Sequence, residues 1–417
     1  MSPHVTIWII AAIATAGVIV RPFHLPEAIW AVAGASLLVV LGLLSPADAL
    51  AGAGKGTNVY LFLTGMMLLA ETARGAGLFD WLAALATGRA KGSATRLFLL
   101  IYGVGTIVTI FLSNDATAVV LTPAVAAAIR TAKAKQPLPY LLICAFVANA
   151  ASFVLPISNP ANLVIYGSHL PPLLQWLPRY LLASALAIVA TYMVLRWTQR
   201  DALRQEVATD VPVPKLSGSG KTTALGIAAT AMVLLAASAV DIPLGLPTAI
   251  AGALTAAIVM IRDRKGPWQS IKNVSWGILP LVAGLFVLVE GLEKTGLIGT
   301  IRSILDHGAE RSAAGAAWGA GIAIAVASNL MNNLPAGLIA GHVVQSAHLS
   351  DQVTRAILIG VDLGPNLSVT GSLATILWLT ALRREGESVG AGTFLTLGIL
   401  VMPPALLLAI GAAMLFD

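Results

Sequence analysis

Residues 65–78 read GMMLLAETARGAGL, and residues 284–297 read GLFVLVEGLEKTGL. The two stretches align without a gap, and the identical pairs are Gly65 and Gly284, Leu69 and Leu288, Glu71 and Glu290, Gly77 and Gly296, Leu78 and Leu297. Further along, the SND of residues 113–115 takes the place of the MNN of residues 331–333, with a register shift of one residue. This internal repeat predicts a chain built from two related halves.

The composition indicates a protein embedded in lipid. Of the 417 residues, 57% are hydrophobic and only 11% are charged, whereas soluble domains carry about 25% charged residues. Apolar stretches long enough to cross a bilayer recur along the chain, so the predicted fold class is an all-α polytopic membrane protein. The first run, Val5 to Val20, follows no Lys or Arg and is interpreted as a membrane helix, not a cleaved signal. We expect ten transmembrane helices, at residues 5–20, 28–44, 57–75, 140–168, 172–196, 222–240, 246–261, 275–293, 353–382 and 391–416.

Two further apolar pairs, residues 95–129 and 313–347, are predicted to be re-entrant hairpins. Basic residues flank the first pair on both sides, and its first arm, Leu97 to Leu112, is short for a full span. Irregular backbone at membrane depth is tolerated only where it is buried in protein or lines a cavity. The two hairpin tips therefore indicate a transport site.

The predicted halves are joined by a linker. The first repeat covers residues 1–196, a polar cytoplasmic linker rich in Pro, Gly and Ser covers 197–221, and the second repeat covers 222–417. We expect the linker to be flexible. Because each half contains five spans and one hairpin, the second copy should be inverted, which is a secondary-transporter architecture with two broken helices at the midplane.

The charge distribution predicts the orientation. The net charge of +6 lies in short loops between apolar runs and indicates no nucleic-acid partner. The positive-inside rule puts the larger set of Lys and Arg residues in the cytoplasm. It therefore opens hairpin 95–129 to the cytoplasm, opens hairpin 313–347 to the outside, and places both termini outside the plasma membrane. The remaining basic residues fall on the outer side: Lys55, Arg179, Lys294, Arg302, Arg311 and Arg355.

Four polar segments interrupt the apolar runs, and we call them the site elements: SNDAT at 113–117, PISNPAN at 156–162, NLMNNLP at 329–335 and DLGPNLSVTG at 362–371. The prolines in the last three of these elements break helices and leave backbone groups unpaired. The alternative, a plain kink or helix cap, is reasonable for any one element but not for all four. With Asn149 from a neighbouring helix, the candidate substrate-binding residues are Ser113, Asn114, Asp115, Thr117, Asn149, Ser158, Asn159, Asn162, Asn332, Asn333, Pro365, Asn366, Ser368 and Thr370.

Asp115 is the leading candidate for proton coupling, and Asp362 is the second. A charge at bilayer depth costs roughly 2.5–3.5 kcal/mol on insertion scales and marks function by default. Removal from water favours the protonated carboxyl group, which suits Asp115 to bind and release a proton. Ser, Asn and Asp also cap helices well, so a capping role is the alternative.

Several other residues are interpreted as structural. Glu71 and Glu290 are expected to pair with Arg74 and Lys294 or with a neighbouring polar group, Cys144 to be an inert apolar residue, and His342 to be an ordinary helix residue. The SGSGKTT of residues 217–223 lacks the first glycine of a phosphate loop and no strand precedes it. The chain also lacks an H-E-x-x-H zinc pattern and a G-x-S-x-G elbow. A transporter is therefore expected, without enzyme activity, cofactor or metal site.

The runs SNDATAVVLTP, ISNPANLVIYG, NNLPAGLIAG and GPNLSVTGSLATILWL resemble the arsenite efflux pump family of the ion transporter superfamily. The resemblance covers nearly the whole chain and falls in both hairpin tips and both broken helices. It implies export of arsenite and antimonite in exchange for protons, and it allows a soluble arsenite-stimulated ATPase as partner. It also implies a site lined by Asn114, Asp115, Asn159, Asn162, Asn332, Asn333, Pro365 and Asn366.

Two alternative functions remain open. The site elements could also ligate Na⁺, which would make the protein a sodium/proton antiporter or a sodium-coupled anion carrier. The chain could instead be the membrane channel subunit of an ATP-driven complex, with loops 74–96 and 197–221 as docking sites. Oligomeric state and coupling stoichiometry do not follow from the sequence, and silicic or boric acid resemble arsenious acid as neutral hydroxides.

Overall fold

The computed structural model describes residues 2–167, 170–264, 267–346 and 349–415. The predicted ends of span 140–168, hairpin 313–347 and span 391–416 lie outside these ranges. Within the described residues the regular secondary structure is helical, apart from one isolated antiparallel bridge between Ser93 and Glu206. The predicted all-α fold class is confirmed.

The described helices of the first half begin close to the predicted spans. In chain order they are α1 Pro3–Val20, η1 Pro22–His24, α2 Glu27–Val40, α3 Pro46–Lys55, α4 Thr57–Gly75, α5 Leu78–Ala90, α6 Ala94–Leu112, α7 Asn114–Ala116, the π-helix η2 Thr117–Leu121, α8 Thr122–Thr131, α9 Leu138–Ala150, η3 Pro156–Ser158, α10 Pro160–Tyr166 and α11 Leu173–Thr198.

The second half follows a similar order of long and broken helices. Its elements are η5 Ala202–Arg204, α12 Gly218–Ala239, α13 Gly245–Asp263, α14 Pro267–Asn273, α15 Ile278–Lys294, α16 Leu297–Arg311, α17 Ala313–Met331, α18 Asn333–Ser346, α19 Asp351–Leu363, η6 Gly364–Leu367, α20 Leu373–Arg384 and α21 Ala391–Ala413.

Seven of the described helices are long and apolar enough to cross a membrane: α1, α6, α11, α12, α13, α17 and α21. Two of these, α6 and α17, are the first arms of the predicted hairpins. The expectation that the first of these arms is short was wrong, because α6 has 19 residues. It begins at Ala94, where Ser93 caps it by accepting a hydrogen bond from the Arg96 amide at 3.2 Å.

Four shorter helices, α3, α5, α14 and α16, were not predicted from the hydropathy pattern. Helices α5 and α16 directly follow the repeated sequence, and in each case the chain turns at a glycine. Gly77 has φ +71° and Gly296 has φ +81°, a left-handed conformation that glycine adopts at little cost. The conserved spacing within the two repeat sequences is thus matched by the same helix–turn–helix geometry.

The glycines that open the repeat sequences lie at close helix contacts. A Cβ atom on Gly65 in α4 would lie 2.2 Å from the Thr248 carbonyl oxygen of α13, and a Cβ on Gly284 in α15 would lie 2.7 Å from the Ala31 carbonyl carbon of α2. Each repeat glycine therefore packs against a helix from the other half. Small residues permit this close approach of backbones in membrane proteins.

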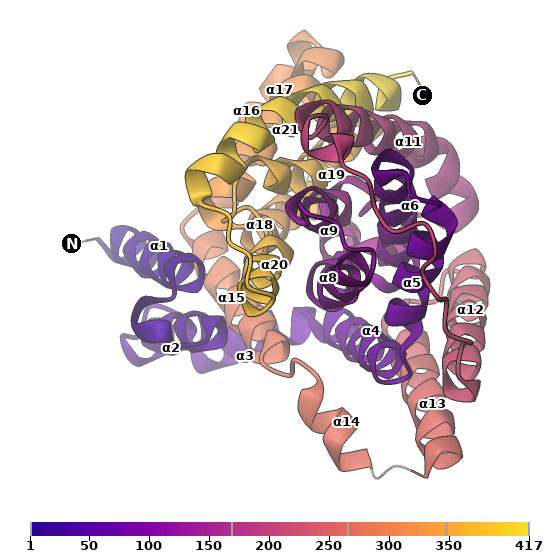
Figure 1. Cartoon of the computed structure of the whole chain (residues 1–417). Coiled ribbons are helices and arrows are strands. Elements are labelled where there is room, and N and C mark those ends of the chain that lie inside the picture. Colours follow the sequence, from indigo (N-terminus) through magenta and orange to yellow (C-terminus); the bar gives the residue numbers. More distant parts are fainter. Residues whose placement is uncertain (1, 168–169, 265–266, 347–348, 416–417) are drawn as a thin grey trace.

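The helices pack in two groups. In one, α4 packs on α13, α13 on α12, and α15 on α2, which also contacts α1. In the other, α17 packs on α19, α11 on α21, and α10 on α18. Helix α16 touches both groups, and α5 packs against α4, α12, α6 and α8. Figure 1 shows α9, α18, α19 and α20 toward the middle of the view, with α1 and α2 at its left, α13 and α14 at its lower edge and α12 at its right.

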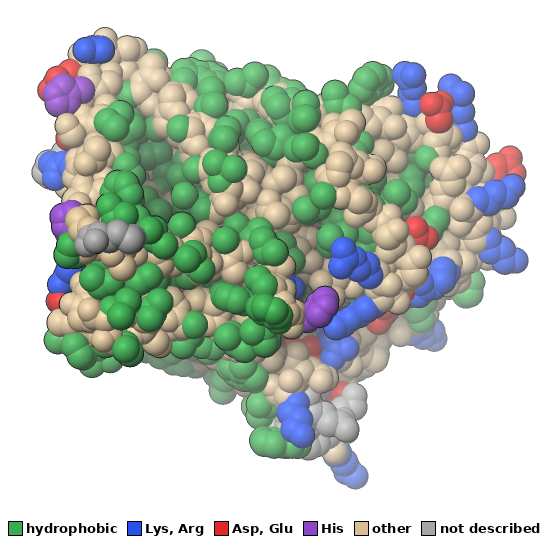
Figure 2. Space-filling model, turned by 90° about the vertical axis from the view of Figure 1, so that its left-hand side faces the viewer, with side chains coloured by type: hydrophobic (Ala, Val, Ile, Leu, Met, Phe, Trp, Pro, Cys, Tyr) green, Lys and Arg blue, Asp and Glu red, His purple; other side chains and the backbone are tan. Residues whose placement is uncertain are grey.

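The surface fits a membrane environment. Large apolar side chains are exposed along the spanning helices, among them Ile13, Met232 and Ile399. In Figure 2 hydrophobic side chains cover the middle of the visible face, whereas Lys and Arg gather toward one end and a smaller charged set lies at the opposite edge. An apolar belt between two charged ends is the pattern expected of a multi-pass membrane protein.

Candidate transport site

The two broken helices meet through their polar side chains. The amide Nδ2 of Asn159, which precedes α10, donates a hydrogen bond to Oδ1 of Asp362 in α19 at 2.7 Å. Both side chains are buried. The Asp362 carboxylate has a second oxygen, Oδ2, which is buried and accepts no hydrogen bond of standard geometry from the described residues. This hydrogen bond is therefore a direct contact between the two halves of the chain.

A second amide contact joins the same two broken helices. Asn149, in the last turn of α9, donates from Nδ2 to Oδ1 of Asn366 at 3.0 Å. Asn366 in turn donates to the carbonyl oxygen of Phe146 at 3.0 Å, and Trp378 of α20 donates to the carbonyl oxygen of Leu141 at 2.9 Å. Three hydrogen bonds thus hold η6 and α20 against α9, whose residues are almost all buried.

The first predicted tip is a break between α6 and α7 at Ser113. This residue has φ +112° and ψ 162°, a region of backbone conformation that is essentially reserved for glycine. Ser113 caps α7 by accepting from the Ala116 amide. The Asn114 side-chain oxygen accepts from the Asp115 amide at 2.9 Å, and Thr117 shares a hydrogen bond with Thr109 at 2.8 Å. Helix α7 contacts α9 and α20, so the break lies next to the broken helix of the other half.

Asp115 is half-buried at this break. Among the described residues its carboxylate forms no hydrogen bond and no ion pair. The π-helix Thr117–Leu121 begins two residues further on, and such elements often mark functional sites within helices. An acid without a fixed partner at a strained break is free to bind a proton or a solute.

The second predicted tip is a break at Asn332, between α17 and α18. Asn332 has φ +74° and ψ 150°, again in the region favoured by glycine. The separation of Ser113 from Asn332 equals that of Gly65 from Gly284. The register shift of one residue in the expected alignment was therefore wrong: Asn114 corresponds to Asn333 and Asp115 to Leu334.

Asn329 organises the polar groups at the second tip. Its Nδ2 donates to the carbonyl oxygens of Ala325 and Gly364, at 2.7 and 2.9 Å, which ties α17 to the break in the second broken helix. Its side-chain oxygen accepts from Ser368 at 2.8 Å, and its backbone oxygen accepts from Thr370 at 3.0 Å. The sequence analysis placed Asn329 within a site element but did not name it as a site residue.

The remaining candidate residues lie in these same clusters. Asn332 donates to the Thr370 carbonyl oxygen at 3.4 Å, and the Asn333 amide donates to the Gly371 carbonyl oxygen at 2.8 Å. In the first half, Ser158 donates to the Ile110 carbonyl oxygen at 2.9 Å. Pro365 lies within η6.

Asn162 acts as an internal clamp of its own loop. It donates to the Ser152 carbonyl oxygen at 2.9 Å, while its own side-chain oxygen is buried and accepts no hydrogen bond from the described residues. Ser152 also lies beside Asp362 and was missed in the sequence analysis, because a single serine in an apolar helix is an unremarkable signal.

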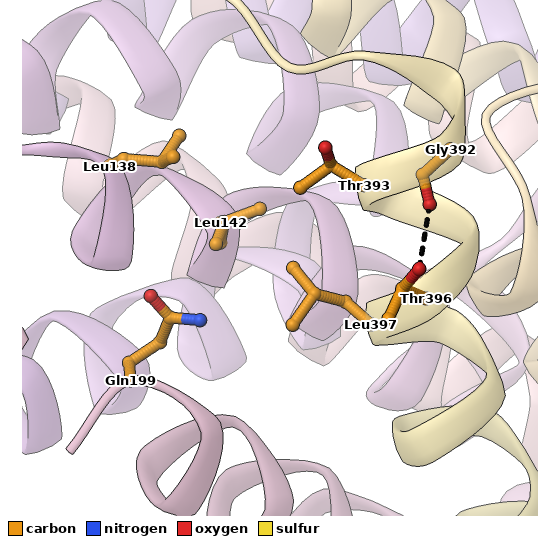
Figure 3. A pocket seen from close by; sticks show the side chains of 7 residues that line it. All are labelled: Leu138, Leu142, Gln199, Gly392, Thr393, Thr396 and Leu397. Atoms are coloured by element: carbon orange, nitrogen blue, oxygen red, sulfur yellow. Dashed lines mark hydrogen bonds between the residues drawn. The ribbon is translucent and has the colours of Figure 1, made fainter. Parts of the chain in front are cut away.

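Neither of two cavities in the described part of the chain is lined by the candidate residues. One, of about 570 Å³, lies between the first turns of α9 and α21, and Figure 3 shows its lining residues Leu138, Leu142, Gln199, Gly392, Thr393, Thr396 and Leu397. The other, of about 350 Å³, adjoins Ile110 and Pro156, and its lining is apolar except for Ser238.

The residues interpreted as structural have defined contacts. Glu71 pairs with Arg74 through two hydrogen bonds of 2.6 and 2.7 Å, as expected. The partner of Glu290 is Lys55 at 2.7 Å and not Lys294, which instead bonds Asp48. Helix α3 was not predicted, and it is this helix that brings Lys55 and Asp48 to the end of α15.

His342 and Cys144 lie outside the breaks at Ser113 and Asn332 in the sequence, and their contacts are with other residues. His342 Nδ1 lies 3.1 Å from a carboxylate oxygen of Glu293. Cys144 is buried in the core around α9.

The chemistry available at the site is that of neutral hydrogen-bonding groups and two carboxyl groups. The four site elements contain no Lys or Arg, and the described residues hold no cluster of His, Cys, Asp and Glu suited to a metal ion. Amides and hydroxyls can both donate and accept, so they suit a small hydroxylated solute. A buried carboxyl group that is not neutralised by a basic residue suits proton binding.

Comparison with known proteins shows which family the chain matches. The family model described as "Citrate transporter" matches residues 7–361. An arsenical pump membrane protein of Escherichia coli K12 is 26% identical over 397 residues and covers 91% of each chain. A putative arsenical pump membrane protein of Bacillus subtilis is 28% identical over 414 residues, which cover 92% of this chain and 93% of the relative.

Solved structures give the same picture for the fold. The YdaH transporter of Alcanivorax borkumensis has a TM-score of 0.55 and 16% identity, covering 88% of this chain and 86% of its own. MtrF of Neisseria gonorrhoeae has a TM-score of 0.55 and 13% identity, covering 100% of this chain and 95% of its own. At such low identity these two show a shared transporter fold only. By the match to its family model and to curated relatives, the chain belongs to the citrate transporter family and is a membrane transporter, not an enzyme, of the group that includes the arsenical pump membrane proteins.

Proposed function

We propose that the protein exports trivalent arsenic and antimony by proton antiport. The observation that carries the proposal is the buried contact of Asn159 with Asp362, surrounded by neutral amides and hydroxyls and without a basic residue in any site element. Arsenious acid is small and largely neutral at pH 7, so hydrogen bonds from Asn, Ser and Thr suit it better than a cationic clamp. The arsenical pump relatives support this choice of substrate.

The site would recognise the oxygens of the substrate. A three-sulfur arsenic site needs three thiolates, and this chain has one cysteine. The hydroxyls of a trihydroxide can each donate and accept a hydrogen bond, which matches the side-chain groups of Asn114, Ser368 and Thr370. Related neutral hydroxides such as silicic and boric acid are the natural competitors for the specificity test.

Proton coupling would use the two acids. Asp115 lies at the first break without a fixed partner, and Asp362 is bonded by one oxygen only. We propose that substrate binding and carboxylate protonation exclude each other, so that the proton entering from outside displaces the substrate. Alternating access would then follow from two inverted halves whose hairpins open to opposite faces.

The test is arsenite accumulation in everted membrane vesicles with an imposed proton gradient and without sodium or ATP. We expect uptake that collapses when a protonophore is added. Asp115→Asn, inserted normally, should lose proton-driven uptake but keep arsenite exchange between the two sides of the membrane. Full proton-driven uptake by this variant would show that Asp115 does not carry the proton.

The match to a citrate transporter model favours one second candidate, a sodium-coupled anion carrier. Backbone carbonyls and Asn and Ser oxygens at the breaks could bind Na⁺, and helix termini can bind an anion without basic side chains. The same vesicles distinguish the two functions. Uptake of citrate or another carboxylate that requires sodium, with no uptake of arsenite, would replace the first proposal by the second.

A further inference from the structure

The segment between α11 and α12 is held against the first hairpin. A flexible linker was predicted here, but residues 203–213, which we call the strap, form a series of specific contacts. Leu203, Val207 and Val211 are buried. Val213 and the Val211 carbonyl oxygen lie over Gly88 of α5 so closely that a Cβ atom there would meet Val213 at 2.5 Å. The expectation of flexibility was therefore wrong for this part of the linker.

The strap bonds to both ends of the first hairpin. At the start of the hairpin, the Val207 amide donates to the Gly92 carbonyl oxygen at 3.3 Å, beside the antiparallel bridge between Ser93 and Glu206. At its end, the Ala208 amide donates to the Ala132 carbonyl oxygen at 2.8 Å. Consecutive strap residues thus connect Gly92, two residues before α6, to Ala132, the residue after α8.

Gln205 strengthens the second of these attachments. Its Oε1 accepts from the amides of Lys135 and Gln136, at 2.7 and 3.1 Å, and its Nε2 donates to the Gln136 carbonyl oxygen at 3.1 Å. One side chain therefore satisfies three backbone groups of the turn that separates α8 from α9. This turn leads into α9, the helix that carries Asn149 to its contact with Asn366.

We propose that Gln205 is a positioning residue for transport: it fixes the two ends of the first hairpin relative to each other and to α9, and so holds the tip at Ser113–Asp115 in its binding geometry. The proposal rests on the proposed function only in taking this tip as part of the transport site. Both arms pack on α5, α9 and η2, but α6 and α8 make little direct contact with each other. A bond at the base therefore constrains how far the two arms can separate.

The first measurement is hydrogen–deuterium exchange of the full-length protein in lipid nanodiscs. In Gln205→Ala we expect faster exchange both in residues 130–138, where the bonds are lost, and in residues 113–117 at the tip. Arg204→Ala is the matched control, because this neighbouring side chain is exposed and pairs only locally with Asp201, at 3.3 Å. Faster exchange confined to residues 130–138 would overturn the proposal, since the effect would end at the turn.

The second measurement is transport in vesicles. With the tip loosened, Gln205→Ala should raise the KM for arsenite about tenfold with kcat changed less than twofold, a loss comparable to the net contribution of one or two hydrogen bonds. Gln205→Glu should recover part of this loss, because its carboxylate still accepts from the amides of Lys135 and Gln136. An unchanged KM, or a parallel fall of kcat and the melting temperature, would mean that Gln205 only stabilises the fold.

A cleavage experiment covers the case in which Gln205→Ala does not fold. A protease site inserted between Pro214 and Lys215, both exposed, cuts the linker but leaves Gln205 attached through α11. We expect cleaved protein to retain the wild-type KM and tip exchange. A cleaved protein with a tip that exchanges faster would show that continuity with α12, and not the bonds of Gln205, holds the hairpin. If wild-type vesicles take up no arsenite, the proposed function fails, whereas the exchange data still decide the role of Gln205.

Discussion

Asn159 and Asp362 come from different halves of the chain, yet the amide of one donates to the carboxylate of the other at 2.7 Å in a buried environment. Each residue belongs to the polar break of its own half, Asn159 as the N-cap of α10 and Asp362 in the last turn of α19. The contact therefore couples the two broken helices through a group that can change its charge.

Substitutions at Asn159 and Asp362 test separately the hydrogen bond and the ionisable group of this contact. Asn159→Ala removes the donor and leaves a buried carboxylate oxygen unpaired, which should lower the free energy of unfolding by about 1–3 kcal/mol. Asp362→Asn keeps an acceptor for Asn159 but removes the ionisable group, so it should fold normally and lose proton-driven transport. Thermal melting in detergent and vesicle uptake measure the two effects, with the exposed Asn273→Ala as control. A stable Asn159→Ala protein would mean that water or a solute replaces the lost donor.

The backbone conformation of Ser113 predicts that substitution by glycine does not lower the melting temperature. At φ +112° and ψ 162° a non-glycine residue carries strain on the order of 1–3 kcal/mol. Ser113→Gly should therefore melt at the same or a higher temperature than wild type, whereas Ser113→Val should melt lower. If the serine hydroxyl binds substrate, the glycine variant should also bind arsenite more weakly despite its stability. A melting temperature that falls equally in both variants would argue against strain at this break.

The helix contact at Gly65 predicts a large loss of stability for a small change. A Cβ atom at this position would lie 2.2 Å from the Thr248 carbonyl oxygen, and backbone cannot move aside as a flexible side chain can. Gly65→Ala should lower the melting temperature and the yield of folded protein, and Gly284→Ala should do the same at the equivalent contact. Gly103→Ala is the matched control, because a Cβ there meets no other atom within 4 Å, and alanine should stabilise α6 by about 1 kcal/mol.

The ion pair between Asp48 and Lys294 predicts a dependence of stability on pH. The hydrogen bond from Lys294 is the main cause that lowers the pKa of Asp48 below its ordinary value of 3.8, and a bond from Ser45 adds to it. A carboxylate with a lowered pKa stabilises the folded state above its ordinary pKa, and this contribution is lost as the pH falls through the folded-state pKa. Wild type should thus melt above Asp48→Asn at pH 6, and the gap should close below about pH 4.

Melting curves across this pH range test the prediction, with Asp210→Asn in an exposed loop as control. A gap that is the same at pH 3 and pH 6 would show that the difference comes from something other than the charge of Asp48.

The sequence by itself determined the fold class and the site elements. The apolar runs specify helices because no other open structure satisfies its backbone in lipid, and polar residues are expensive at this depth, so the four segments with Asn, Ser, Asp and Pro could be recognised without a structure. The repeat sequences were also visible, since Gly77 and Gly296 are required by the same left-handed turn.

Only the tertiary structure decided which polar groups meet. The spacing of Asn159 and Asp362 along the chain says nothing about their distance, because contacts between halves depend on how whole helices pack. Asn329 bonds four groups from α17 and the second broken helix, and Gln205 reaches a turn far from it in sequence. Hydropathy and helix periodicity report local preference, whereas these bonds depend on three-dimensional packing. For this reason the sequence did not reveal helix α3, the Lys55 partner of Glu290 or the ordered strap.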